Sequence, residues 1–72
     1  MKLFVSVCHD RHVDNDIKVW KDSLKAISYA KAFMLDYLPR NIEEYDIIGW
    51  LYNATCESSE SSAYVFETEL KS

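Results

Sequence analysis

The chain has 72 residues, one glycine, one proline and a formal net charge of −4, and 49% of its residues are hydrophobic. This length allows one small domain over residues 1–72, and the hydrophobic fraction is too high for a disordered chain. The low glycine content excludes collagen-like and glycine-rich phosphate-loop proteins. Apolar runs are shorter than the roughly 18 residues of a membrane span, and the start does not resemble a secretory signal. We therefore expect a soluble, cytoplasmic protein.

The N-terminal part predicts a β-hairpin. Residues 2–9 alternate between two faces, as do residues 16–20, where Ile17 and Val19 share one face. The polar residues 10–15 between these strands have turn character and predict a long loop. The two faces of the first strand are Leu3, Val5 and Val7 on one side and Phe4, Ser6 and Cys8 on the other.

An amphipathic helix is predicted next. Asp22 and Ser23 are both favourable N-cap residues. Apolar residues then follow at helical spacing over about four to five turns. Pro39 is expected to end the helix, because proline disfavours helical geometry in the residue before it. The predicted apolar stripe consists of Leu24, Ile27, Ala30, Phe33, Met34 and Leu38.

The C-terminal part predicts a second hairpin. Residues 40–45 are expected to form a connection, with one helical turn as an option. Residues 46–56 are expected to form a central strand in which Gly49 marks either a bulge or a close approach of another segment. Residues 57–62 form a polar, acidic turn. Residues 63–70 alternate again and predict the last strand.

These elements give an α+β fold. We expect an antiparallel sheet of three to four strands in the order β-β-α-β-β, with the helix packed on one face; the order becomes β-α-β-β if residues 16–20 do not pair. The other face then lacks a helix, and an exposed aromatic patch there is typical of a partner or dimer surface. The aromatic residues from which this patch is drawn are Phe4, Trp20, Trp50, Tyr52, Tyr64 and Phe66.

Charge is distributed unevenly along the chain. Residues 1–40 contain seven bases and five acids, whereas residues 41–72 contain seven acids and one base. The phosphate groups of nucleic acids repel the acidic segment 41–72, so direct nucleic-acid binding is not expected. A basic groove on a partner protein would attract it. The alternative is a solvated face that keeps the protein soluble.

The polar residues between the first two strands form the densest cluster of candidate functional groups. They are His9, Asp10, Arg11, His12, Asp14 and Asp16. Histidines and carboxylates are ordinary ligands for divalent metals and ordinary acid–base groups, but their spacing here matches no known motif. We therefore predict no catalytic residue, no metal and no cofactor. A third interpretation is recognition of an anion or a partner carboxylate by Arg11 together with His9 and His12.

The two cysteines, Cys8 and Cys56, are far apart in sequence, each within a strand-like run. Without a secretion signal, two reduced and buried thiols are expected, although a disulfide between neighbouring strands remains an option.

Four motifs together resemble a family of very small proteins carried by bacteriophages, prophages and other mobile elements. They are DRHVD at residues 10–14, AISYA at 26–30, GWLY at 49–52 and YVFE at 64–67. Relatives often have a glycine in the turn where this chain has ESSESS, so the second hairpin departs from the pattern. The resemblance implies a non-enzymatic counter-defence inhibitor, similar to anti-CRISPR proteins, that binds a host protein such as a CRISPR effector or another defence component.

The residues that we expect to bind the partner combine the polar loop, the acidic C-terminal part and one aromatic ring. They are Asp10, Arg11, His12, Asp14, Trp50, Glu57, Glu60, Glu67 and Glu69. One alternative is a sponge for a nucleotide immune signal, in which His9, Arg11 and His12 hold phosphate and Trp20 or Trp50 stacks on the base. A sponge this small predicts an oligomer. Another alternative is a homodimeric host-takeover protein with a different target. A membrane partner is not expected.

Overall fold

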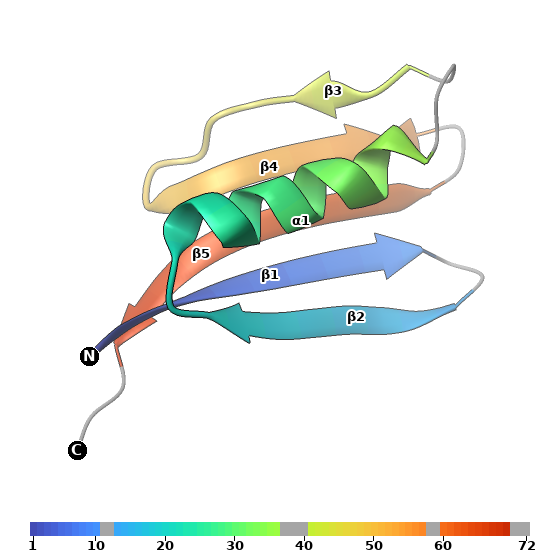
Figure 1. Ribbon diagram of the computed structural model, residues 1–72. Coiled ribbons are helices and arrows are strands. Elements are labelled where there is room, and N and C mark those ends of the chain that lie inside the picture. Colours follow the sequence, from blue (N-terminus) through green and yellow to red (C-terminus); the bar gives the residue numbers. More distant parts are fainter. Residues whose placement is uncertain (11–12, 37–40, 58–59, 70–72) are drawn as a thin grey trace.

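The computed structural model describes residues 1–10, 13–36, 41–57 and 60–69 of the chain (Figure 1). The strands of the described residues form one antiparallel sheet in the order β2-β1-β5-β4-β3, and the helix α1 lies across one face of it. The elements are β1 (Lys2–Asp10), β2 (Val13–Trp20), α1 (Ser23–Leu35), β3 (Glu43–Glu44), β4 (Trp50–Cys56) and β5 (Ser61–Glu69). The α+β class and the helix on one face of the sheet are confirmed. No helix among the described residues is long and apolar enough to cross a membrane.

In the described part of the chain the sheet has five strands, not the three to four that the sequence predicted. The additional strand is β3, which lies in the segment predicted as a connection. It pairs with β4 through Glu43↔Thr55 and Glu44↔Ala54, and the Tyr45 amide extends the contact by donating to the Asn53 carbonyl at 3.1 Å. β3 forms because the main-chain groups on the outer side of β4 need partners. The central strand is consequently β5, not the segment 46–56.

The first hairpin has the predicted faces but a much shorter loop. Val5 pairs with Val19 and Val7 with Ile17, so these residues share a face. Pairing continues to Asp10↔Val13, so the predicted loop 10–15 is wrong: most of it lies in β1 and β2. Strand pairing has therefore overridden the local turn propensity of these residues. Between the pairs Cys8↔Asp16 and Asp10↔Val13, β2 contains one residue more than β1, and a shift in register accommodates it.

The second turn is also shorter than predicted, because Ser61 and Ser62 belong to β5. In this turn the Glu60 amide donates a hydrogen bond to the Glu57 carbonyl at 3.1 Å. Glu60 has φ 55°, a left-handed conformation that favours glycine.

The helix begins as predicted but ends earlier. Asp22 is the N-cap, and its Oδ1 accepts from the amide of Leu24 at 2.8 Å. The last helical residue is Leu35, so the helix ends before Pro39, which lies outside the described residues with Leu38. The predicted stripe is wrong at Leu24, which is 72% exposed. The residues buried on α1 are Ala26, Ala30 and Met34.

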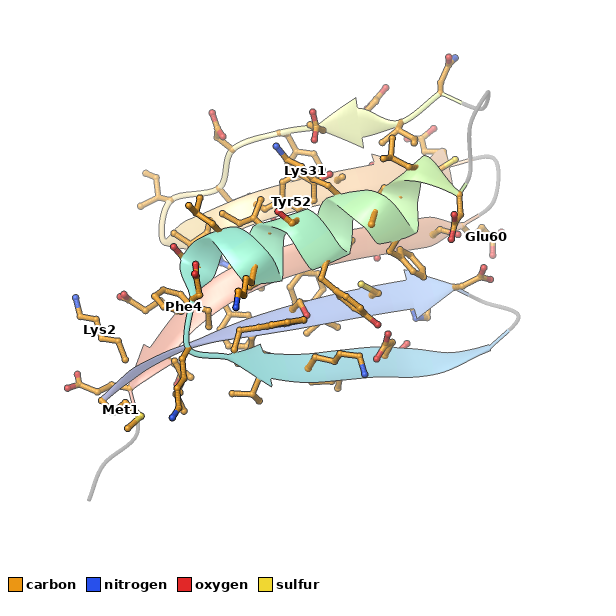
Figure 2. All side chains as sticks on the ribbon, viewed as in Figure 1. Met1, Lys2, Phe4, Lys31, Tyr52 and Glu60 are labelled. Atoms are coloured by element: carbon orange, nitrogen blue, oxygen red, sulfur yellow. The ribbon has the colours of Figure 1, made fainter. Side chains whose placement is uncertain are left out.

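The core lies between α1 and the sheet, where small residues on both sides allow close packing (Figure 2). Its buried members are Cys8, Ala26, Ala30, Met34, Tyr52, Ala54, Cys56, Ala63 and Val65. Both cysteines are buried thiols, as expected, and they are not joined in a disulfide. Ser6 is also buried, and its hydroxyl accepts a hydrogen bond from Trp20 Nε1 at 2.9 Å.

Candidate functional site

The candidate site is the sheet face opposite α1, which no described element covers (Figure 1). We call it the open face. Side-chain alternation and the strand register place a mostly uncharged set of residues on it: Leu3, Val5, Val7, His9, Ile17, Val19, Glu43, Trp50, Asn53, Thr55, Ser62, Tyr64, Phe66 and Thr68. Glu43 belongs to the edge strand β3. Ile17 is 61% exposed, Val19 60% and Trp50 39%. A large apolar surface on so small a domain is typical of an interaction site.

An aromatic cluster of Trp50, Tyr64 and Phe66 lies on the open face. The Trp50 ring meets the other two edge-to-face, with centroid distances of 4.7 Å to Tyr64 and 5.5 Å to Phe66. Tyr64 and Phe66 come from the same strand, and their centroids lie 6.3 Å apart. These mutual contacts hold the rings in place, while Trp50 is exposed and Tyr64 and Phe66 are half-buried. Phe4, Trp20 and Tyr52 from the predicted aromatic set instead pack on the helix side.

A turn before β4 positions Trp50. The Trp50 amide donates to the Ile47 carbonyl at 3.0 Å, and Gly49 has φ 89°, as the third residue of a type II turn requires. The strand predicted at 46–56 therefore begins only at Trp50. A register shift between Trp50 and Tyr52 makes Leu51 the additional residue of a bulge.

The same turn exposes further apolar side chains beside Trp50. Ile48 is fully exposed at its tip, Ile47 is 42% exposed and Leu51 is 44% exposed. We call Ile47, Ile48 and Leu51 the apolar tip. It extends the apolar surface past the end of the open face.

Asn53 is the polar residue buried on the open face. It pairs with Tyr64 in the sheet and is only 4% exposed. Its Nδ2 has no hydrogen-bond partner among the described residues. A buried donor without an acceptor is costly, so an acceptor supplied by a bound molecule would remove this cost.

The predicted partner-binding residues do not form one surface. Asp10, Glu57 and Glu60 lie at the end of the sheet where β1 and β4 finish and β5 begins. Glu67 and Glu69 lie at the opposite end, separated by the length of β5, about 26 Å at 3.3 Å per residue.

The remaining predicted residues are also divided. Glu67 is on the helix side, since it pairs with Phe4, and it forms an exposed ion pair with Lys2 at 3.7 Å (Figure 2). Trp50, at the same end, is on the open face. Asp14 lies in β2, and Arg11 and His12 lie outside the described residues.

The polar cluster around His9 is divided by the sheet. His9 Nδ1 donates to Asn15 Oδ1, whereas Asp16, on the helix side, accepts from the Tyr29 hydroxyl. Among the described residues, no group of three or more His, Cys, Asp or Glu side chains could hold a metal ion. Burial, together with the charge of Asp16, raises the pKa of the Cys8 thiol to about 11. This thiol is therefore protonated at neutral pH and is a weak nucleophile.

The residues suggested for a nucleotide sponge are also separated within one chain. Trp20 packs against Tyr29, with ring centroids 5.4 Å apart, and its Nε1 is bonded to Ser6. Trp50 pairs with Phe66, and Phe66 pairs with Val5 of β1. Val5 is four residues from His9, so Trp50 and His9 are offset by about 13 Å along the strand direction. A phosphate at His9 and a base on either tryptophan would therefore require a second copy of the chain.

The prediction missed Asn53 and the apolar tip. Asn53 was detectable as a polar residue within an apolar strand, but only the register shows that it is buried on the uncovered side. The apolar tip could have been predicted from Gly49, because a glycine within a strand-like segment indicates a turn as readily as a bulge.

Comparisons with protein-family models, curated proteins and solved structures give no match to this chain.

Proposed function

We propose that this protein is a non-catalytic binding protein that contacts another protein through its open face. The observation that carries the proposal is the aromatic cluster of Trp50, Tyr64 and Phe66, held by ring contacts on a face without a covering element among the described residues. Tryptophan and tyrosine are the residues that most often dominate binding energy at protein interfaces.

The charge pattern supports a partner of complementary charge. The centre of the open face is uncharged, whereas acidic side chains lie at both ends of the sheet, including Glu57 and Glu60 at one end and Glu67 and Glu69 at the other. A matching surface has an apolar centre and a basic rim. The rim contacts are exposed, so salt should weaken them, while the aromatic contacts should persist.

Together with the resemblance to small phage and mobile-element proteins, this surface supports a counter-defence inhibitor acting in the bacterial cytoplasm. Its target is a host protein with a basic, nucleic-acid-binding surface, such as a CRISPR effector. Inhibition follows from occupying that surface, and no reaction is required.

The test is retention of a host protein by the immobilised chain, followed by binding measurements with the purified partner. Trp50→Ala should weaken binding at least tenfold, because a tryptophan that dominates an interface contributes about 2 kcal/mol or more and tenfold corresponds to about 1.4 kcal/mol. Leu24→Ala is the matched control, because Leu24 is an exposed apolar residue on α1 and not on the open face. This control should bind as the unmodified chain does.

Two outcomes would contradict the proposal. One is equal binding of the partner by the Trp50→Ala and Leu24→Ala variants. The other is stabilisation by a cyclic or ADP-ribose-like nucleotide in a thermal-shift screen without retention of any host protein, which would favour the sponge. Arg11→Ala and His12→Ala, tested in parallel, determine whether these two residues contribute to either activity.

A further inference from the structure

β2 is an edge strand with an open outer side. It runs over Val13–Trp20, and in the described parts of the chain only β1 pairs with it. The other edge is the two-residue strand β3. Alternate residues of an edge strand direct unpaired amide and carbonyl groups outward, where another strand can pair with them. Figure 1 shows β2 along one border of the sheet with nothing beyond it.

We propose that β2 pairs with β2 of a second copy of this chain, antiparallel and about a two-fold axis at Ile17. This inference concerns the edge of the sheet and does not rest on the function proposed for the open face. We choose a second copy of the chain as the partner strand because one symmetric register of β2 with itself places opposite charges next to each other.

The register argument depends on strand geometry. Outward main-chain groups and side-chain faces both alternate, so a two-fold pairing must place residues of the same face opposite each other. Registers centred on Asp16, Ile17 or Lys18 are the ones that use the middle of β2. The first places Asp16 opposite itself, although it also sets Lys18 opposite the second copy's position 14, an aspartate. The last places Lys18 opposite itself. Of the three, only the register centred on Ile17 sets no like charges opposite each other. Like charges directly opposite are unfavourable.

The register centred on Ile17 places opposite charges, not like charges, across from each other. Lys18 then lies opposite the partner's Asp16, and this pair occurs twice because of the symmetry. Both side chains are available, since 48% of the Lys18 side chain and 38% of that of Asp16 are exposed. Within one chain, Lys18 Nζ already lies 3.7 Å from Asp16 Oδ1 and 5.7 Å from the centre of the Tyr29 ring. Dimerisation would join the two ion pairs into one network of four charges.

The same register places Ile17 opposite the partner's Ile17 on the open face. The two-fold axis is perpendicular to the sheet, so both helices lie on one side and both open faces on the other. The result is a continuous sheet of two sets of five strands, with twice the apolar surface of one chain.

Cysteine crosslinking tests this geometry. Directly opposed residues have Cα atoms about 4.5–5.5 Å apart, within the range of about 4.4–6.8 Å that a disulfide requires. Ile17→Cys should therefore form a disulfide-linked dimer under mild oxidation. Val19→Cys is the matched control, because Val19 is equally exposed on the same face, yet the two Val19 Cα atoms lie four residues apart along the strand direction, about 13 Å. The unmodified chain, whose own cysteines are buried, gives the background.

A charge exchange tests the register by an independent readout. In sedimentation or light scattering, the unmodified chain should show a concentration-dependent species of twice the 8.4 kDa chain mass. K18E and D16K should each be monomeric alone, because each places like charges opposite one another. Mixed in equal amounts, they should form a heterodimer, because both cross-strand pairs are again of opposite charge. Circular dichroism of each variant checks folding, since D16K also loses the Tyr29 hydrogen bond.

A selective crosslink for Ile17→Cys and a restored dimer on mixing would support the proposal. Equal crosslinking of both cysteine variants, or none, would overturn it. A monomeric unmodified chain at millimolar concentration would overturn it too, as would K18E that dimerises like the unmodified chain. Should D16K not fold, the K18E and cysteine results still decide the question.

Discussion

The hydroxyl of Tyr29 in α1 donates a hydrogen bond to the carboxylate of Asp16 in β2. This contact connects the helix to the edge strand of the sheet. The hydrogen bond, assisted by burial and the negative charge of Asp16, raises the pKa of Tyr29 from 10.0 to about 12.

The first prediction is a loss of stability at alkaline pH. Because the pKa of Tyr29 is raised in the folded state, its contribution is fully present below the unfolded pKa of 10.0 and is lost as the pH rises through about 12. Burial, with a hydrogen bond to Glu44, also raises the pKa of Tyr52, so this residue acts in the same direction. Urea unfolding at several pH values should show the decline, and Tyr29→Phe should make it shallower. An unchanged slope in Tyr29→Phe would contradict the assignment to this residue.

The second prediction contrasts two apolar truncations. Met34 is 1% exposed in the core, so Met34→Ala should lower the free energy of unfolding by about 2–5 kcal/mol. Trp50 is 39% exposed, so Trp50→Ala should cost less, about 1–2 kcal/mol. Chemical denaturation of both variants gives the comparison. A larger loss for Trp50→Ala would mean that the aromatic cluster is mainly structural.

The third prediction concerns the buried amide on the open face. Asn53→Leu replaces a donor that lacks a partner with an apolar group of similar size. We expect the free chain to be stabilised by about 1 kcal/mol, because the desolvation cost of the amide disappears. Thermal unfolding measures this change. Partner binding by the same variant should weaken if the partner supplies an acceptor to Asn53, and a destabilised variant would show that this amide is satisfied in solution.

The fourth prediction concerns the turn that positions Trp50. An added Cβ at Gly49 meets no atom within 4 Å, so steric contact does not oppose Gly49→Ala. The φ of 89° does oppose it, and we expect a loss of about 1–2 kcal/mol. Denaturation together with tryptophan fluorescence should report both the lower stability and a changed environment of Trp50. Unchanged values for both would indicate that the turn adopts another conformation.

Local physical chemistry was sufficient for several elements. Asp22 is an N-cap because its short carboxylate can reach the first free amides of the helix, a property that depends only on neighbouring residues. The faces of the first hairpin follow from strict alternation, which holds wherever a strand forms. These features were predictable because they arise within a few residues of sequence.

Other features depend on contacts between distant segments. Glu43 and Glu44 have no strand-like pattern, and they form β3 because β4 offers main-chain partners there. Leu24 fits a helical stripe, but the sheet lies beneath Ala26, Ala30 and Met34 instead. Long-range pairing decided these cases because it satisfies more main-chain groups and buries more surface than the local preference does.

The candidate site shows the same division. The sequence determined that one sheet face would lack a helix and that aromatic residues would be available for it. Only the tertiary structure selected Trp50, Tyr64 and Phe66, because a bulge at Leu51 and the register of β4 with β5 decide which rings share a face. The same pairing placed His9 and Asp16 on opposite sides of the sheet, although they are close in sequence. Side-chain direction in a strand changes at every residue, so a cluster in the sequence becomes one surface only when the register allows it.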